Sequence, residues 1–92
     1  MKLTPQSPDQ GFQFPGEFEL TAMGPAAAEL AALVPGLLRE AGVAGVSEVL
    51  RTRPSSNGNY LSVTVAVFAE TREHYEAAHE VLRKHPDIKW TL

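Results

Sequence analysis

The stretch YLSVTVAVFA, Tyr60–Ala69, decides the fold of this chain because its residues alternate in character. Every second residue is aliphatic: Leu61, Val63, Val65 and Val67. The residues between them carry hydroxyl groups, a methyl group or aromatic rings: Tyr60, Ser62, Thr64, Ala66 and Phe68. Successive side chains of a β-strand point to opposite faces of its sheet. The alternation therefore predicts a strand with one face in a core, centred on Val63, Val65 and Val67, and the other face open.

Three more strands are expected around this one. Residues 17–23 alternate in the same way and predict a second half-buried strand. Residues 46–53 predict a strand whose apolar residues do not share one face, so its register stays open. Asn57-Gly58 is typical of a tight hairpin turn between that strand and the central one. Residues 87–92 predict a short final strand.

Two segments have the spacing of amphipathic helices. Residues 26–41 place their larger aliphatic side chains on one face, and Gly42 is expected to end this helix. Pro35 lies inside it and is expected to bend it, on a side away from the apolar centre. Thr71 is a suitable N-cap for a second helix that runs to about His85.

The resulting order, β-α-β-β-α-β, predicts an α+β fold of ferredoxin-like layout. Two helices on one face of a four-stranded antiparallel sheet bury all the apolar stripes at once. The strand order in such a sheet is 4-1-3-2. We expect a single domain over residues 14–92, preceded by a flexible tail over residues 1–13, which lacks hydrophobic periodicity.

Composition excludes several classes of function. The 92 residues carry a net charge of −3, which disfavours nucleic acid as the main partner. The chain has no cysteine, so disulfides, thiol nucleophiles and thiolate metal sites are excluded, and a reducing cytoplasm is the expected compartment. It has no apolar run of about 20 residues, the length that spans a membrane.

Three segments carry a resemblance to a known family: FPGEFELTAMG at 14–24, PSSNGNYLSVTV at 54–65 and IKWTL at 88–92. Together they resemble the small bacterial YbeD-like proteins, over nearly the whole domain. The resemblance implies the ferredoxin-like fold, with a layout similar to that of ACT-type regulatory domains. It supplies no substrate.

Neither a metal site nor a catalytic site is expected. His74, His79 and His85 are spaced by five and six residues, whereas two histidines that bind one metal ion from a helix are spaced by four. Ser55 and Ser56 lack the surrounding motif and the base that activate a nucleophilic serine. We therefore expect no catalytic residue, no cofactor and no enzymatic activity.

The first hypothesis is a regulatory module that binds a small anionic metabolite. The predicted topology brings the start of the first helix and the 54–59 hairpin to one end of the sheet. Free backbone N–H groups at a helix start, together with arginines, favour anions. The candidate ligand-binding residues are Gly24, Arg51, Arg53, Ser55, Ser56 and Gly58.

The alternative is a protein-interaction module that uses the open sheet face or an edge strand, with a protein partner or as a weak homodimer. The open face predicted above is less charged than a solvated sheet face usually is. Its candidate interface residues are Tyr60, Ser62, Thr64 and Phe68.

Overall fold

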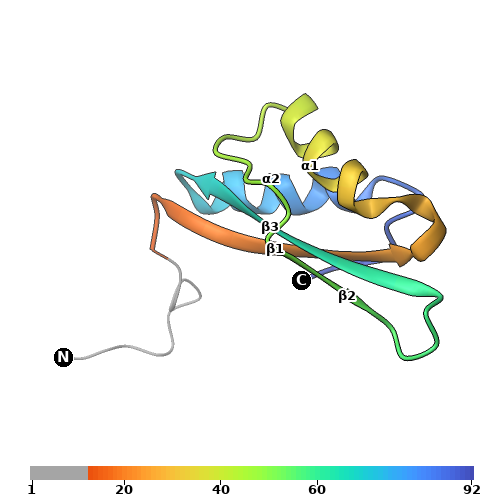
Figure 1. The fold of residues 1–92 in the computed structure, drawn as a ribbon. Helices are drawn as coiled ribbons and strands as arrows, with labels where there is room; N and C mark the ends of the chain where they lie inside the picture. The colour runs from red at the N-terminus through yellow and green to blue at the C-terminus, as the bar shows by residue number, and fades with distance from the viewer. Residues whose placement is uncertain (1–12) are drawn as a thin grey trace, which may run out of the picture.

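A computed structural model describes residues 13–92. Its elements are β1 (Gly16–Pro25), the short 3-10 helix η1 (Ala26–Ala28), α1 (Leu30–Glu40), β2 (Arg51–Pro54), β3 (Tyr60–Ala69), α2 (Arg72–Arg83) and β4 (Trp90–Thr91). The strands form one antiparallel sheet in the order β2-β3-β1-β4, and both helices cover the same face of it (Figure 1). This is the predicted order 4-1-3-2, so the predicted fold is confirmed. The predicted tail, apart from Gln13, lies outside the described residues.

The centre of the sheet is the long pairing of β1 with β3, from Gly16 opposite Ala69 to Pro25 opposite Tyr60. The aliphatic face of β3 lies under both helices, as its alternation predicts. The fully buried large side chains are Leu20, Leu30, Val34, Leu38, Val63, Val65, Val67 and Leu82. Burying each contributes about 1.5–3 kcal/mol, so this layer is the main source of stability.

Helix α1 begins four residues later than predicted. Glu29 has φ 56°, a left-handed conformation that separates η1 from α1. The Ala26 N–H donates to the carbonyl of Asn59 at 2.9 Å, so the strand pairing reaches the first residue of η1, and residues 26–28 form a 3-10 turn instead of the first turn of α1. The helix then runs through Pro35 without interruption, and Pro35 is buried, not on the solvated side as predicted.

The C-terminus of α1 closes as its glycine predicts. Gly42 has φ 84°, a conformation that glycine adopts without strain. Its N–H donates to Arg39 at 3.0 Å, and the Val43 N–H donates to Leu38 at 3.0 Å. These two bonds satisfy helix carbonyls in the Schellman arrangement and turn the chain back toward β3.

The strand predicted over residues 46–53 is regular only as β2, Arg51–Pro54. Ala44 pairs with Phe68 and Arg51 pairs with Thr64. The two pairs are therefore seven residues apart on this segment, whereas they are only four residues apart on β3. The extra residues form a bulge. In it, the Ser47 hydroxyl accepts from the Ala66 N–H at 2.9 Å, in place of a strand carbonyl. This bulge is the reason why the apolar residues of the segment do not share one face.

Helix α2 has the predicted N-cap. Thr71 Oγ1 accepts a hydrogen bond from the His74 N–H at 3.2 Å.

The final strand is shorter than predicted. The strand β4 comprises only Trp90–Thr91, and beyond it Leu92 exchanges two backbone hydrogen bonds with Thr21, of 3.0 and 2.8 Å.

Candidate functional site

Several sequence-predicted site residues come together on the sheet face opposite the helices, here called the open face. Strand register fixes its members. Two rows cross all four strands: Arg51–Thr64–Thr21–Leu92 and Arg53–Ser62–Met23–Trp90. The other members lie on the two central strands: Glu17 opposite Phe68, Glu19 opposite Ala66, and Pro25 opposite Tyr60.

Large apolar side chains are exposed around the rim of the open face. Exposed fractions are 44% for Tyr60, 38% for Phe68, 51% for Trp90 and 77% for Leu92. Within residues 13–92, the fifth large exposed apolar residue is Leu50, in the bulge. The solvated face of an antiparallel sheet is usually polar. Here Trp90 and Leu92 expose apolar surface in neighbouring rows at the β4 side, whereas Tyr60 and Phe68 lie at opposite ends of β3.

The hydroxyl groups at the centre of the open face already have partners. The Thr21 and Thr64 hydroxyl oxygens lie 2.8 Å apart, one donating to the other. The Ser62 hydroxyl donates to the Arg53 carbonyl at 3.3 Å. Thr64 is only 4% exposed, so little of its own surface is available to a partner, and its place in an interface stays a prediction. Because these hydroxyls form hydrogen bonds within the sheet, a partner that covers them leaves few polar groups without a hydrogen bond.

The β2 side of the open face is cationic. Arg51 Nη2 donates to Glu19 Oε1 at 2.6 Å, and both side chains are more than half exposed. Arg53 lies one row further along, opposite Ser62, and has no acidic partner within residues 13–92. Among the described residues, Arg53 and Glu17 are therefore exposed charges of this face that form no ion pair.

The residues of the predicted anion site do not come together as expected. Gly24 alternates with Met23 on β1 and therefore faces the helices, while Arg51 and Arg53 lie on the open face. A Cβ atom at Gly24 would overlap the Asp87 carbonyl oxygen and approach Leu30 Cδ1 to 3.3 Å. The glycine is thus required for close packing, and the space expected to admit a ligand is filled.

The hairpin residues form a third, separate group. The Ser55 hydroxyl donates to Asn57 Oδ1 at 2.9 Å and accepts from the Tyr60 N–H at 3.1 Å. Gly58 has φ 76° and closes the turn. Ser56 is exposed on the same hairpin, which extends away from the body of the domain (Figure 1). These contacts stabilise the hairpin turn, and the Ser55 hydroxyl forms both of its hydrogen bonds within that turn.

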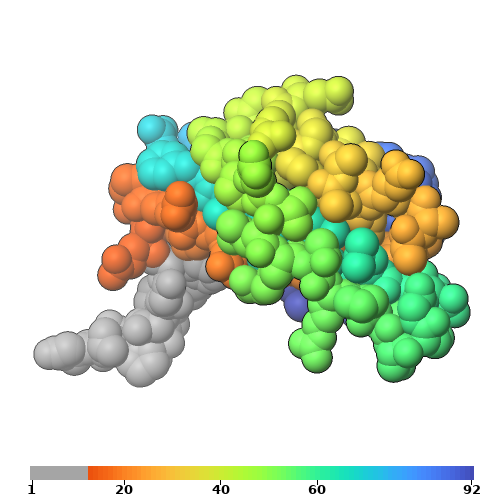
Figure 2. Space-filling model, viewed as in Figure 1, coloured from red at the N-terminus to blue at the C-terminus, as the bar shows by residue number. Residues whose placement is uncertain are grey.

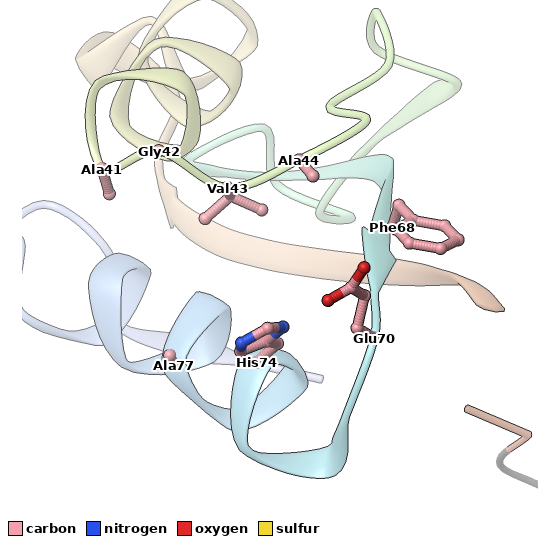
Figure 3. Close-up of a pocket in the computed structure, with 8 residues that line it drawn as sticks. All are labelled: Ala41, Gly42, Val43, Ala44, Phe68, Glu70, His74 and Ala77. Carbon is pink, nitrogen blue, oxygen red and sulfur yellow. The ribbon is translucent and has the colours of Figure 1, made fainter. Parts of the chain in front are cut away.

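A groove of about 440 Å³ lies between the C-terminal end of α1 and the start of α2 (Figure 3). It is open because the surrounding side chains are small: Ala41, Gly42, Ala44 and Ala77. Glu70 and His74 supply its polar groups and Val43 a larger apolar side chain, while Phe68 borders the groove with its ring directed away from it (Figure 3). Both Glu70 and His74 are solvent-exposed. Within residues 13–92 no group of three potential metal ligands gathers, here or elsewhere.

His79 is a buried polar residue that the sequence reasoning missed. It is 8% exposed, its Nδ1 lies 3.1 Å from Thr91 Oγ1, and its ring packs edge-on against Tyr75 at 4.8 Å. Burial lowers the pKa of His79 from 6.5, and the nearby Arg83 lowers it further. The signal was present: His79 lies four residues after Tyr75 and three before Leu82, on the apolar stripe of α2.

Comparison with known proteins shows the family. The profile described as "Protein of unknown function (DUF493)" matches residues 9–92. The chain belongs to this family. UPF0250 proteins of Stenotrophomonas maltophilia (51% identical), Xanthomonas campestris (47%) and Xylella fastidiosa (47%) are similar over the full length of both chains.

Family membership confirms the resemblance to the YbeD-like bacterial proteins. The names of these relatives state no ligand, partner or reaction. Of the helices formed by residues 13–92, none combines the length and the apolar character needed to cross a membrane.

Proposed function

We propose that this chain is a non-catalytic binding module that docks a partner protein on its open face. The observation that carries the proposal is the pairing of Thr21 with Thr64 at 2.8 Å, inside a rim of exposed Tyr60, Trp90 and Leu92. An interface needs apolar side chains to bury, and polar groups that keep their hydrogen bonds when water leaves. The open face has both before any partner arrives.

Edge-to-edge strand pairing is the weaker alternative. The two outer strands are short: β2 has four residues, ends in proline and exposes two arginines, and β4 has two residues. Figure 2 shows the chain between α1 and β2 as a continuous surface that joins the helix layer to the sheet edge. Short, charged and covered edges resist pairing with another strand, which favours the face as the docking surface.

A regulatory module with an anion at the hairpin end has less support. Gly24 faces the helices, and the arginines lie on the other side of the sheet. A catalytic role is also disfavoured, because Glu70 and His74 in the groove are exposed and stay in contact with water. The absence of cysteine supports a cytoplasmic setting for the module.

A photo-crosslinking residue in place of Tyr60 tests the proposal. Tyr60 is exposed on the rim, and benzoylphenylalanine keeps its aromatic ring. The matched control replaces Glu73, an exposed residue of α2 on the helix side. Illumination of living bacteria should give discrete adducts for the Tyr60 variant and none for the Glu73 variant. Equal adducts at both positions, or none at Tyr60, would contradict docking on this face.

A further inference from the structure

We propose that the partner on the open face is a second copy of this chain, packed sheet against sheet about a two-fold axis parallel to the strands. This inference rests on the proposed docking function and specifies which protein binds the open face. It follows from the asymmetry of the open face, which is cationic along one outer strand and apolar along the other.

The two outer strands carry complementary chemistry in the same rows. Arg51 and Arg53 lie on β2, and Leu92 and Trp90 end the same two rows on the β4 side. Arg53 has no acidic partner within the part of the chain that the structure describes, and Trp90 exposes half of its surface. A guanidinium over an exposed indole is a favourable cation–π contact. Within one chain the two side chains are separated by the width of the sheet.

A two-fold axis parallel to the strands brings them together. Such an axis exchanges the outer strands, so β2 of one copy faces β4 of the other. Arg53 then faces the partner subunit's Trp90 in the same row, and symmetry repeats the contact. Two stacked sheets lie about 10 Å apart, within the combined reach of an arginine and a tryptophan.

The other way to stack two copies lacks this complementarity. An axis across the strands, through the Thr21–Thr64 row, sets Arg51 against the partner subunit's Arg51. Like charges facing one another across an interface are unfavourable. That arrangement also leaves Arg53 opposite the bulge segment, where β2 has already ended. The cation–π contact between Arg53 and the partner subunit's Trp90 therefore favours the axis along the strands.

The centre of such an interface can become dry without loss of hydrogen bonds. Its middle row contains Thr21 and Thr64, whose hydroxyls bond to each other at 2.8 Å. The next row contains Ser62, whose hydroxyl bonds to the Arg53 carbonyl, and the flexible side chain of Met23. Methionine adapts to irregular contacts, so it can fill the gap beside Trp90.

Trp90 reports directly on this interface because it is the single tryptophan of the chain. We expect its emission to shift to shorter wavelength as the protein concentration rises toward about 1 mM, over the range of a weak dimer. Sedimentation velocity on the same samples should show the 10.0 kDa chain doubling in mass over the same range.

Arg53→Ala should weaken the dimer by about 5- to 30-fold, since two cation–π contacts are lost. Arg83→Ala is the matched control, because Arg83 is an exposed arginine of α2 on the helix side, paired with Glu80. It should leave the dimerisation constant unchanged. Circular dichroism melts of both variants show whether the fold is retained.

Each other outcome overturns the inference. A protein that stays monomeric to about 1 mM with unshifted Trp90 emission has no second copy on this face. A dimer that Arg53→Ala and Arg83→Ala affect equally has a different axis. In either case Tyr60 crosslinks to another protein would leave the docking function standing, whereas the absence of any Tyr60 adduct would remove both.

Discussion

Replacing Gly24 with alanine tests whether this glycine serves packing or ligand access. Gly24 lies near the end of β1, where the backbone of the 85–89 segment crosses it. The added methyl group would overlap the Asp87 carbonyl oxygen and press on Leu30 Cδ1 at 3.3 Å. Since the first of these contacts is with backbone, rotation of a side chain does not relieve it.

The expected cost is about 2–3 kcal/mol, the upper part of the range for overpacking. For a domain of this size, each kcal/mol lowers the melting temperature by about 4–8 °C. The variant should therefore melt roughly 8–24 °C below the parent. Urea unfolding monitored by far-ultraviolet circular dichroism measures the free energy of unfolding directly.

Two other glycines serve as matched controls. Gly36 lies inside α1 with nothing within 4 Å of an added Cβ atom, so Gly36→Ala should stabilise the protein by about 0.5–1 kcal/mol. Gly58 has φ 76° in open space, and Gly58→Ala should cost about 1 kcal/mol through backbone strain alone. If Gly24→Ala falls within about 0.5 kcal/mol of the parent, the close approach of Asp87 is not present in solution.

Three further changes probe the core, a helix cap and a buried histidine. Val65→Asp places an unpaired charge in the fully buried layer and should unfold the domain or cost several kcal/mol, of the order of its whole stability; a dispersed amide spectrum with an unchanged melting temperature would refute this register. Thr71→Ala removes the bond to the His74 N–H and should cost about 1 kcal/mol in urea unfolding, whereas Thr71→Ser should cost less. Burial, and then the nearby Arg83, lower the pKa of His79 in the folded protein. As the pH falls below 6.5, the unfolded chain therefore binds the proton more readily than the folded chain, and the free energy of unfolding should decrease over this range. His79→Gln should flatten this dependence, and a parent protein whose stability is constant between pH 7 and pH 5 would contradict it.

The central layer was predictable because it depends on alternation alone. The aliphatic residues of β3 and the matching residues of β1 define one buried face wherever the neighbouring strands lie. The cap at Thr71 and the end of α1 at Gly42 are also local, since each is set by contacts within a few residues. These features needed no knowledge of the tertiary structure.

The start of α1 and the predicted anion site depended on contacts that are distant in the sequence. Residues 26–29 have good helix propensity, but the Ala26 N–H is bound by Asn59 and Glu29 turns left-handed. The bulge after Ala44 sets which face Arg53 occupies, and its length is fixed by the pairing with β3. The closeness of Asp87 to Gly24 has no local signal at all. Propensity and spacing therefore predicted the helices and strands, but not which face of the sheet each side chain of the edge strand β2 occupies.

The open face depends on the helix layer through β4, the strand that supplies Trp90. Several contacts hold this segment. The Lys89 N–H donates to the Met23 carbonyl at 2.8 Å, and Leu92 exchanges two backbone hydrogen bonds with Thr21. His79 pairs with Thr91, and Asp87 packs over Gly24. The side chain of Thr91 points to the helices, and its neighbour Trp90 points to the open face. A change that loosens any of these contacts should release Trp90 before it affects the β1–β3 core. The same contacts therefore support both the stability of the fold and the position of Trp90 on the open face.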